Sequence, residues 1–270
     1  MKLVASMIVK NEMDRYLPLA VSHLLTYVDE IRVLDDGSTD GTYEFLDGKS
    51  AVKVLRNEGP HFFEHEGQAR QKLLDWTFEA QADYVLAIDA DEFVGEPKIL
   101  RAGIESSALP VYILQLVEAW QVNKGGISIR VDGLWGPRKV PMLYMPPDKA
   151  PPPSAARRRG SRIGTAAADA RRAWRIADRQ LACGREPQAV VAESRRAPVL
   201  GTHVFHFGWT RQSERQARAE RYFEHDGGNF HQNRHLQSIL WPDDKVGLKG
   251  LPWPEGLRPI AADLMAYSDR

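Results

Sequence analysis

The sequence predicts an α/β fold in which helices flank a mostly parallel central sheet. In the first third of the chain, short apolar runs recur and are separated by segments with helical spacing. A polar cluster follows almost every run. Parallel strands need crossover connections, and the helical segments between the runs supply them. The chain has 270 residues, which is enough to bury a sizeable core.

Four apolar runs have the length and composition of buried strands. They cover residues 3–9, 30–34, 52–55 and 84–88. Three segments between them place apolar residues on one helical face. These residues are Leu17, Val21, Leu24, Leu25 and Val28 in the first helix, Tyr43, Phe45 and Leu46 in the second, and Ala69, Leu73, Trp76 and Ala80 in a third helix over 67–81. The polar ends of the strands are therefore predicted at the carboxyl edge of the sheet, where open α/β sheets bind ligands.

The stretch Ile88-Asp89-Ala90-Asp91-Glu92 places two carboxylates directly after a buried strand. Oxygen ligands suit a hard divalent cation such as Mg²⁺ or Mn²⁺, which keeps other coordination positions open for a diphosphate. Two solvated acids at the start of a loop would give the same pattern, so this motif needs support from elsewhere. Without a metal, we expect mutual repulsion between Asp91 and its acidic neighbours, Asp89 and Glu92.

Three further motifs precede this stretch. In chain order, the four motifs are Met7-Ile8-Val9-Lys10-Asn11-Glu12, Asp35-Asp36-Gly37-Ser38-Thr39-Asp40-Gly41-Thr42, Gly67-Gln68-Ala69-Arg70 and Asp89-Ala90-Asp91-Glu92. In this order and spacing they resemble the family 2-like glycosyltransferases over roughly residues 1–95. The resemblance implies a GT-A fold, which is Rossmann-like, with a C-terminal acceptor-side extension. It also implies sugar transfer from a nucleotide-diphosphate donor to an acceptor hydroxyl, dependent on Mn²⁺ or Mg²⁺.

The resemblance assigns roles on the donor side. Asp36 is expected to contact the nucleobase or ribose, although Asp35 and Asp36 would also serve as helix caps. Arg70 is expected near the diphosphate, Asp89 at the ribose or a metal-bound water, and Asp91 as a catalytic metal ligand. The remaining predicted nucleotide-sugar-binding residues are Val9, Asn11, Glu12 and Ala90. Many relatives stack an aromatic ring on the base where this chain has Lys10-Asn11-Glu12, so the nucleobase is left open.

A late strand is predicted over residues 200–207, and it ends in an aromatic–Gly–Trp turn. The resemblance implies that a histidine from such a strand completes the metal shell, and imidazole is a sound ligand for Mn²⁺. His206 is the first candidate because Gly208 allows close backbone approach, and His203 is the second. A core histidine is the alternative interpretation. Trp209 is expected in the core or stacked on a sugar.

The acceptor side carries weaker signals. Inverting transfer needs a base that deprotonates the acceptor hydroxyl, and Glu118 and Asp132 are the candidates. Glu118 follows a strand-like run at 111–117, and Asp132 lies in the loop beyond it. Neither residue is distinguished by spacing, so the stereochemistry of transfer stays open. The acceptor is expected to be a carbohydrate, a glycolipid or a protein.

Composition limits the other classes of function. The formal net charge is +0, and the single Cys183 rules out an internal disulfide, which is typical of a reducing cytoplasm. No apolar run reaches about 18 residues, so we expect a cytoplasmic protein that is soluble or peripheral to a membrane. Four segments are expected: a nucleotide-sugar half at 1–110, acceptor-side strands at 111–145, a flexible basic insertion rich in Pro, Ala and Arg at 146–198, and a metal and acceptor segment at 199–270.

A helix is predicted over residues 210–225, with a stripe of arginines at 211, 215, 218 and 221. Intrahelical ion pairs on a solvated face are the favoured interpretation, and steering of the diphosphate is the alternative.

Two other functions remain open. A nucleotidyltransferase would share the fold, but it needs a Gly-rich basic loop after the first strand, and residues 10–14 contain no glycine. A nucleic-acid-binding module would use the Arg-rich part of 146–198, yet no reading motif accompanies it, so no nucleic-acid partner is expected.

Overall fold

The computed structural model describes residues 1–58, 62–149, 197–232 and 234–269. Its strands are β1 (Leu3–Val9), β2 (Glu30–Asp35), β3 (Val52–Arg56), β4 (Tyr84–Ala87), β5 (Glu92–Val94), β6 (Val111–Asn123), β7 (Gly126–Arg130), β8 (Arg138–Tyr144), β9 (Val199–His206) and β10 (Leu248–Leu251). The α-helices are α1 (Leu17–Leu24), α2 (Thr42–Asp47), α3 (Phe62–Phe78), α4 (Pro97–Ser106), α7 (Gln212–Gln232), α8 (Arg234–Gln237) and α9 (Ala261–Ser268). Short 3-10 helices lie at Ser238–Leu240, Asp243–Lys245 and Glu255–Ile260.

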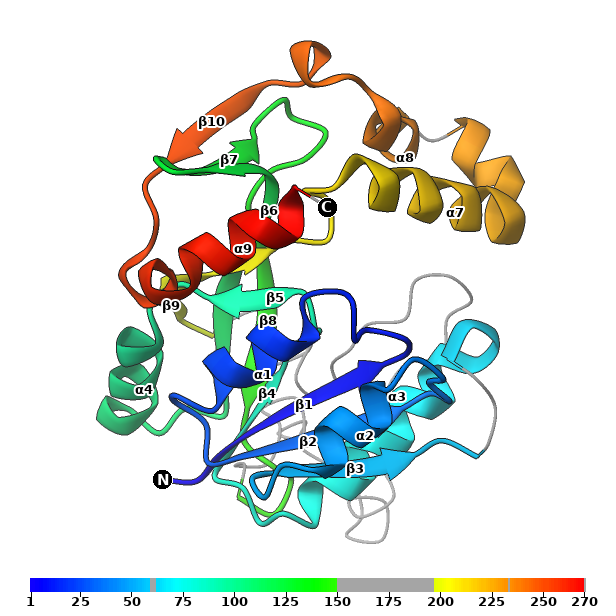
Figure 1. Ribbon diagram of the computed structural model, residues 1–270. Helices are drawn as coiled ribbons and strands as arrows, with labels where there is room; N and C mark the ends of the chain where they lie inside the picture. The colour runs from blue at the N-terminus through cyan, green and yellow to red at the C-terminus, as the bar shows by residue number, and fades with distance from the viewer. Residues whose placement is uncertain (59–61, 150–196, 233, 270) are drawn as a thin grey trace, which may run out of the picture.

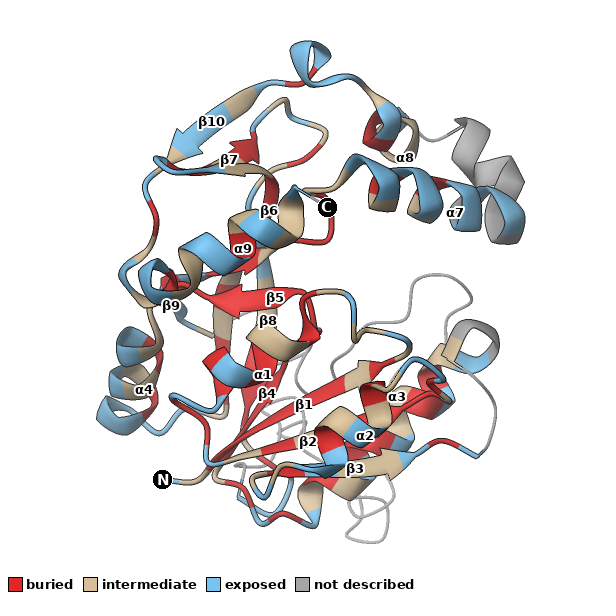
Figure 2. Ribbon diagram, viewed as in Figure 1, coloured by how far each residue is buried: buried red, intermediate tan, exposed pale blue. Residues whose placement is uncertain are grey.

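The predicted α/β fold is confirmed, and all four early strands form where their apolar runs predict them. β3, β2, β1 and β4 lie side by side in that order, and each neighbouring pair is parallel. β1 is one of the two inner strands of this group and is buried along most of its length (Figure 2). Parallel strands are covered on both faces, which is why these sequences are apolar without alternation.

Helices cover the two faces of the parallel strands (Figure 1). α1 and α2 pack on the face that carries Leu3, Ala5 and Val33. α3 packs on the opposite face, against Val4 and Leu34. Successive residues of β1 therefore enter different cores, as the two-residue period of a strand requires.

Two of the predicted helices differ from expectation at their ends. α3 begins at Phe62, five residues before the predicted start, and a kink at His65 interrupts it. It ends at Phe78, so Ala80 lies in the following turn and is still buried. α1 ends at Leu24, so Leu25 is exposed and Val28 packs from beyond the helix. The apolar pattern identifies most of the buried residues correctly, with Leu25 an exception, and places the helix ends less accurately.

Beyond α4 the sheet becomes mixed. β8 pairs antiparallel with β4, β6 with β8, β7 with β6, and β10 with β7. β9 lies between β6, to which it is parallel, and β5, to which it is antiparallel. Tyr112 and Leu114 of β6 and Met142 of β8 share one core with β1 and α1, so the sheet and its core are continuous across residue 110.

The C-terminal segment lies over the end of the molecule that holds β5, β7 and β9 (Figure 1). α9 contributes Leu264 to a second core with Phe93 and Phe205, and α7 projects from that region with much of its surface exposed (Figure 2). The predicted insertion at 146–198 falls almost entirely outside the described residues, as does Cys183. In the described part of the chain, no helix has the length and apolar character needed to span a membrane.

Candidate functional site

The loop after β1 is tied to the loop after β2 by side-chain hydrogen bonds. The Asn11 amide donates to Ser38 Oγ at 2.9 Å, and the Thr39 amide donates to Asn11 Oδ1 at 2.8 Å. The Glu12 amide donates to Thr42 Oγ1 at 2.9 Å. Asn11 has a φ of 53°, a left-handed conformation that asparagine tolerates better than most residues. Val9 lies directly before this loop, and its carbonyl accepts a 2.8 Å bond from the Asp36 amide.

Asp35 and Asp36 are both fully buried at the end of β2. Asp36 accepts hydrogen bonds from Asn57 Nδ2 at 2.7 Å and from the Phe62 amide at 3.0 Å, and it faces Lys10 Nζ at 3.6 Å. Asp35 accepts from the Ser38 amide, at 3.2 Å through one oxygen. Both carboxylates therefore organise the surrounding loops, and the nucleotide contact of Asp36 stays a prediction.

Arg70 and Asp89 line the same shallow pocket at the carboxyl edge, together with Ser6 and Tyr144. Nε of Arg70 donates a 2.7 Å hydrogen bond to the carboxylate of Glu66, and this bond fixes the orientation of the guanidinium group. Ala90, between the two aspartates, is buried. The packing of α3 beside β1 and β4 thus brings Arg70 and Asp89, two predicted donor-binding residues, to one pocket.

Asp91, His206 and Glu118 form a chain of contacts in the interior. Nε2 of His206 lies 3.2 Å from Asp91 Oδ2, and Nδ1 of the same ring lies 2.5 Å from Glu118 Oε2. Strand register explains the arrangement, because His206 of β9 pairs with Glu118 of β6 on one side and with Glu92 of β5 on the other. Residues far apart in the sequence thereby meet beside the Asp-x-Asp turn.

Opposite charges dominate this cluster. Burial disfavours the charged form of Asp91, but His206 and Arg218 outweigh burial and hold the pKa of Asp91 well below its usual range. Burial also opposes the imidazolium, yet Asp91 and Glu118 raise the pKa of His206 to about 10. Burial is again outweighed at Glu118, whose pKa falls to about 2 because of His206 and Arg138.

The expected repulsion between Asp91 and its acidic neighbours is therefore wrong. Cationic side chains surround Asp91. The carboxylate of Glu92 is turned to the backbone instead, where it accepts a 2.9 Å bond from the Asp89 amide.

Arg218 of α7 reaches into the same cluster. Its Nη2 donates to Asp91 Oδ2 at 2.5 Å, and its guanidinium carbon lies 4.8 Å from the Trp209 ring centroid. Gly208 makes room for this arrangement, because a Cβ there would lie 2.4 Å from Arg218 Nη2 and 2.5 Å from Asp91 Oδ2. The glycine predicted to permit close approach thus sits against the carboxylate of the Asp-x-Asp motif.

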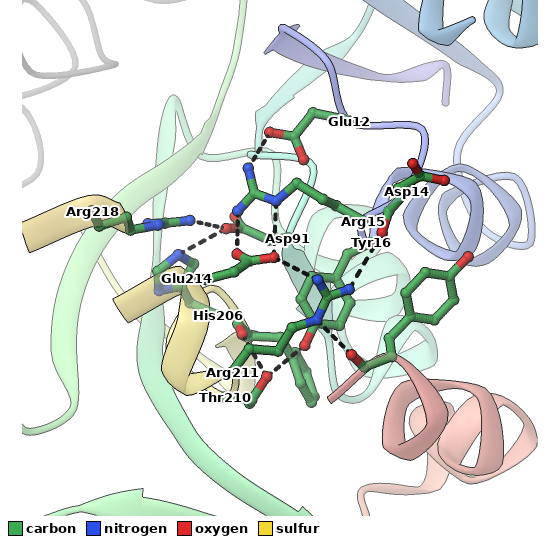
Figure 3. Close-up of polar contacts among 12 residues, drawn as sticks. Glu12, Asp14, Arg15, Tyr16, Asp91, His206, Thr210, Arg211, Glu214 and Arg218 are labelled. Carbon is green, nitrogen blue, oxygen red and sulfur yellow. Dashed lines mark hydrogen bonds and ion pairs between the residues drawn. The ribbon is translucent and has the colours of Figure 1, made fainter. Parts of the chain in front are cut away.

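A second ionic network joins the loop after β1 to the start of α7 (Figure 3). Arg15 donates to Glu214 through Nε at 3.1 Å and Nη2 at 2.5 Å, and to Glu12 through Nη1 at 2.7 Å. Arg211 also donates to Glu214, at 3.0 Å. Burial raises the pKa of Glu12 to about 7 despite the nearby Arg15. Among the described residues, none forms a hydrogen bond with Glu12 Oε2.

Comparison with known families identifies the N-terminal segment. Residues 5–102 match the sequence profile of the family described as glycosyl transferase family 2. The matched range holds all four motifs, including Asp91. Residues 5–102 are therefore similar to the family 2 glycosyltransferases. No curated protein matches the chain.

Several solved structures are similar to this chain. A crystal structure of S. aureus TarS, residues 1–349, matches at 16% identity with a TM-score of 0.47, over 89% of this chain and 71% of that chain. The same fragment in complex with UDP-GlcNAc matches at 18% identity and a TM-score of 0.44, over 89% and 72%. A glucosyl-3-phosphoglycerate synthase from M. tuberculosis, in complex with Mn²⁺, UDP and glucosyl-3-phosphoglycerate, matches at 19% identity and 0.32, over 43% and 44%.

Oxygen and nitrogen atoms of this site have the chemical character of ligands for a divalent cation. Asp91 Oδ2 and His206 Nε2 converge from different strands, and Glu118 holds the other ring nitrogen, as carboxylates often do behind metal-binding histidines. Within the described ranges, no set of three or more His, Cys, Asp or Glu side chains is arranged to hold a metal. Among the described residues, Asp91 and His206 are thus two candidate ligands, and a cation held by them would need further ligands, such as a diphosphate or water for Mg²⁺.

The other predicted residues lie in different settings. Asp132 is bound by Arg130 and accepts bonds from the amides of Leu134 and Trp135, both at 3.1 Å. These contacts organise the loop after β7. His203 is exposed on β9. Trp209 is buried in the core, and its Nε1 donates to Glu118 at 2.9 Å.

Sequence reasoning missed Arg15 and Arg218. The arginine stripe was interpreted as a solvated face, which is wrong for Arg215 and Arg218. Arg215 is buried, with its guanidinium 4.3 Å from the Trp120 ring centroid, and Arg218 contacts Asp91. Arg211 forms the predicted intrahelical pair with Glu214, three residues on, although its side chain is mostly buried, and Arg221 is exposed as predicted. The spacing of three and four residues was the available signal, but spacing alone cannot tell which face of a helix meets the protein.

Proposed function

We propose that the protein transfers a sugar from a nucleotide-diphosphate donor to an acceptor hydroxyl group of a carbohydrate, a glycolipid or a protein. The observation that carries the proposal is the 3.2 Å approach of His206 Nε2 to Asp91 Oδ2 within a family 2-like segment. Two ligands for a divalent cation thereby meet at the carboxyl edge of the parallel strands, where α/β folds bind nucleotides.

The donor side is assigned to the residues of the family motifs. Asp36 and Asn11 lie in the two joined loops after β2 and β1, and we assign them to the nucleoside. Arg70 and Asp89 share one pocket, which suits the ribose and the diphosphate. A guanidinium fork matches phosphate oxygens, and Glu66 fixes its orientation.

Asp91 and His206 would hold a divalent cation, which offsets the charge on the leaving diphosphate. Glu118 fixes the imidazole ring through Nδ1, so Nε2 faces Asp91. An imidazole nitrogen that held a cation would have to be unprotonated. We therefore assign Glu118 to the positioning of His206.

The contacts of Glu118 and Asp132 suit a positioning role better than that of the base. Glu118 already accepts bonds from His206, Trp209 and Arg138, and its low pKa makes it a poor proton acceptor at neutral pH. Asp132 is occupied by Arg130 and by loop amides. The nucleotidyltransferase alternative gains no support from the loop at residues 10–14, where side chains and not glycine amides make the contacts.

A thermal-shift screen tests the donor class. We expect a UDP-, GDP- or dTDP-sugar to raise the melting temperature in the presence of Mn²⁺, by mass action on the folded state. The shift should disappear when EDTA replaces the metal. A shift of equal size in EDTA would count against the metal assignment, and no shift with any donor would count against the function.

Replacing Asp91 with Asn tests the metal ligand. We expect transferase activity to fall at least about 100-fold, because charge on the leaving group is no longer offset. The free energy of unfolding should also fall, on the order of 1–3 kcal/mol, because His206 and Arg218 lose their shared carboxylate. Asp83 directly precedes the first residue of β4, at the opposite end of the strand from Asp91. Asp83→Asn is therefore the matched control and should keep full activity. Full activity in Asp91→Asn would contradict the assignment.

A further inference from the structure

The Asp91 carboxylate faces two cationic side chains through one oxygen. Arg218 Nη2 lies 2.5 Å from Oδ2, and His206 Nε2 lies 3.2 Å from the same atom. In the proposed function, this oxygen is a ligand of a divalent cation. With a metal–oxygen distance of about 2.1 Å, the ion would lie within about 5 Å of Nη2. Like charges so close repel strongly in a partly buried site, so Arg218 and the metal compete for Asp91.

Arg218 also contacts an aromatic ring and is partly exposed to solvent. The guanidinium rests on the face of Trp209, 4.8 Å from the ring centroid, and the side chain is 18% exposed. Gly208 presents no side chain to it. The helix itself is held separately, because Glu214 in its first turn pairs with Arg15.

We propose that Arg218 is an exchangeable counter-ion, which neutralises Asp91 in the metal-free protein and pairs with the donor diphosphate once a divalent cation takes its place. The inference rests on the proposed function, since it needs a metal on Asp91. The diphosphate bound to that metal comes within reach of the displaced guanidinium, whose planar fork suits phosphate oxygens. Arg218 then stabilises the charge that develops on the leaving group.

Calorimetry with two simple probes tests this exchange. Mn²⁺ alone reports the competition at Asp91, and inorganic pyrophosphate at saturating Mn²⁺ reports the diphosphate contact. We expect Arg218→Gln to bind Mn²⁺ at least about fivefold more tightly and Mn²⁺-pyrophosphate at least about fivefold more weakly than the wild type. Arg218→Lys keeps the positive charge but lacks the planar guanidinium fork. Its two affinities should lie between those of the wild type and those of Arg218→Gln. Arg221→Gln changes an exposed residue of the same helix and should alter neither affinity.

The outcomes separate the inference from the function on which it rests. Equal or weaker Mn²⁺ binding by Arg218→Gln overturns the competition, and unchanged pyrophosphate binding overturns the transfer to the diphosphate. If Arg218→Gln does not fold, the same comparisons apply to Arg218→Lys. A wild-type protein that binds no Mn²⁺, or an Asp91→Asn variant that binds it equally well, overturns the metal site itself. If Mn²⁺ binding depends on Asp91 but not on Arg218, only the proposed exchange is overturned.

Discussion

The surroundings of a single side chain in this protein can determine its protonation state. His23 of α1 is buried, and its Nε2 lies 2.9 Å from the Val94 carbonyl oxygen. Its ring packs against Tyr27 and Phe93, with centroids 5.2 and 5.7 Å away. Burial lowers the pKa of His23 to about 4, only partly opposed by the carbonyl. The native state therefore keeps this histidine neutral.

This histidine makes the stability of the fold depend on pH. In the unfolded chain His23 binds a proton below pH 6.5, whereas in the folded protein it does so only below about 4. Stability should therefore fall as the pH drops from 6.5 toward 4, with a loss of about 2 kcal/mol by pH 5 from this residue. Urea unfolding at pH 7.5 and pH 5 measures it. His23→Gln keeps a donor for Val94 and should lose less stability over the same range, and equal losses would contradict the prediction.

Elements in the C-terminal half depend on close backbone contact. β10 pairs with β7, and Gly126 at the start of β7 has a φ of +152°. A Cβ on Gly126 would lie 1.9 Å from the Leu251 carbonyl oxygen, so only glycine fits at this point. Trp253, beyond β10, donates through Nε1 to the Asn123 carbonyl at 2.9 Å and fixes the same approach from the other side.

Gly126→Ala should loosen β10 from β7. The backbone must move away from Leu251, and we expect a loss of about 1–3 kcal/mol in the free energy of unfolding. Urea denaturation measures the loss, and hydrogen exchange should locate it at the amides of residues 248–251. Gly250→Ala is the control on the partner strand, since a Cβ there meets nothing within 4 Å. Equal stability in both variants would show that the strand pair tolerates the methyl group.

The whole molecule is held together at the site by contacts between its two ends. Arg15 and Glu214 are 199 positions apart and form a two-point ion pair with mostly buried side chains. Tyr16 adds a hydroxyl contact of 2.5 Å to Thr210 and one of 3.2 Å to Ser268. The C-terminal helices are therefore fixed to the loop that carries the first motif.

A double-mutant cycle measures this connection. Arg15→Gln, Glu214→Gln and the combined variant should give a coupling energy of about 1–3 kcal/mol, because the pair is bidentate and shielded. The exposed pair Lys98–Glu255, at 3.2 Å, is the matched comparison and should give coupling near zero. Coupling near zero in both pairs would mean that packing alone holds α7 in place.

Local sequence patterns are sufficient to predict the early part of the fold. The apolar runs identified β1 to β4, the helical spacing identified α1 to α3, and the motifs identified the family and the carboxyl edge. His206 and Gly208 could be selected because they lie at the end of a recognisable strand and just beyond it. Which side chains meet depends instead on the pairing and packing of distant segments. The pairing of β9 with β5 and β6 joins Asp91, His206 and Glu118, and the packing of α7 brings Arg218 to Asp91. These contacts join residues that are separated by dozens of positions, and neither periodicity nor spacing along the chain encodes such distances.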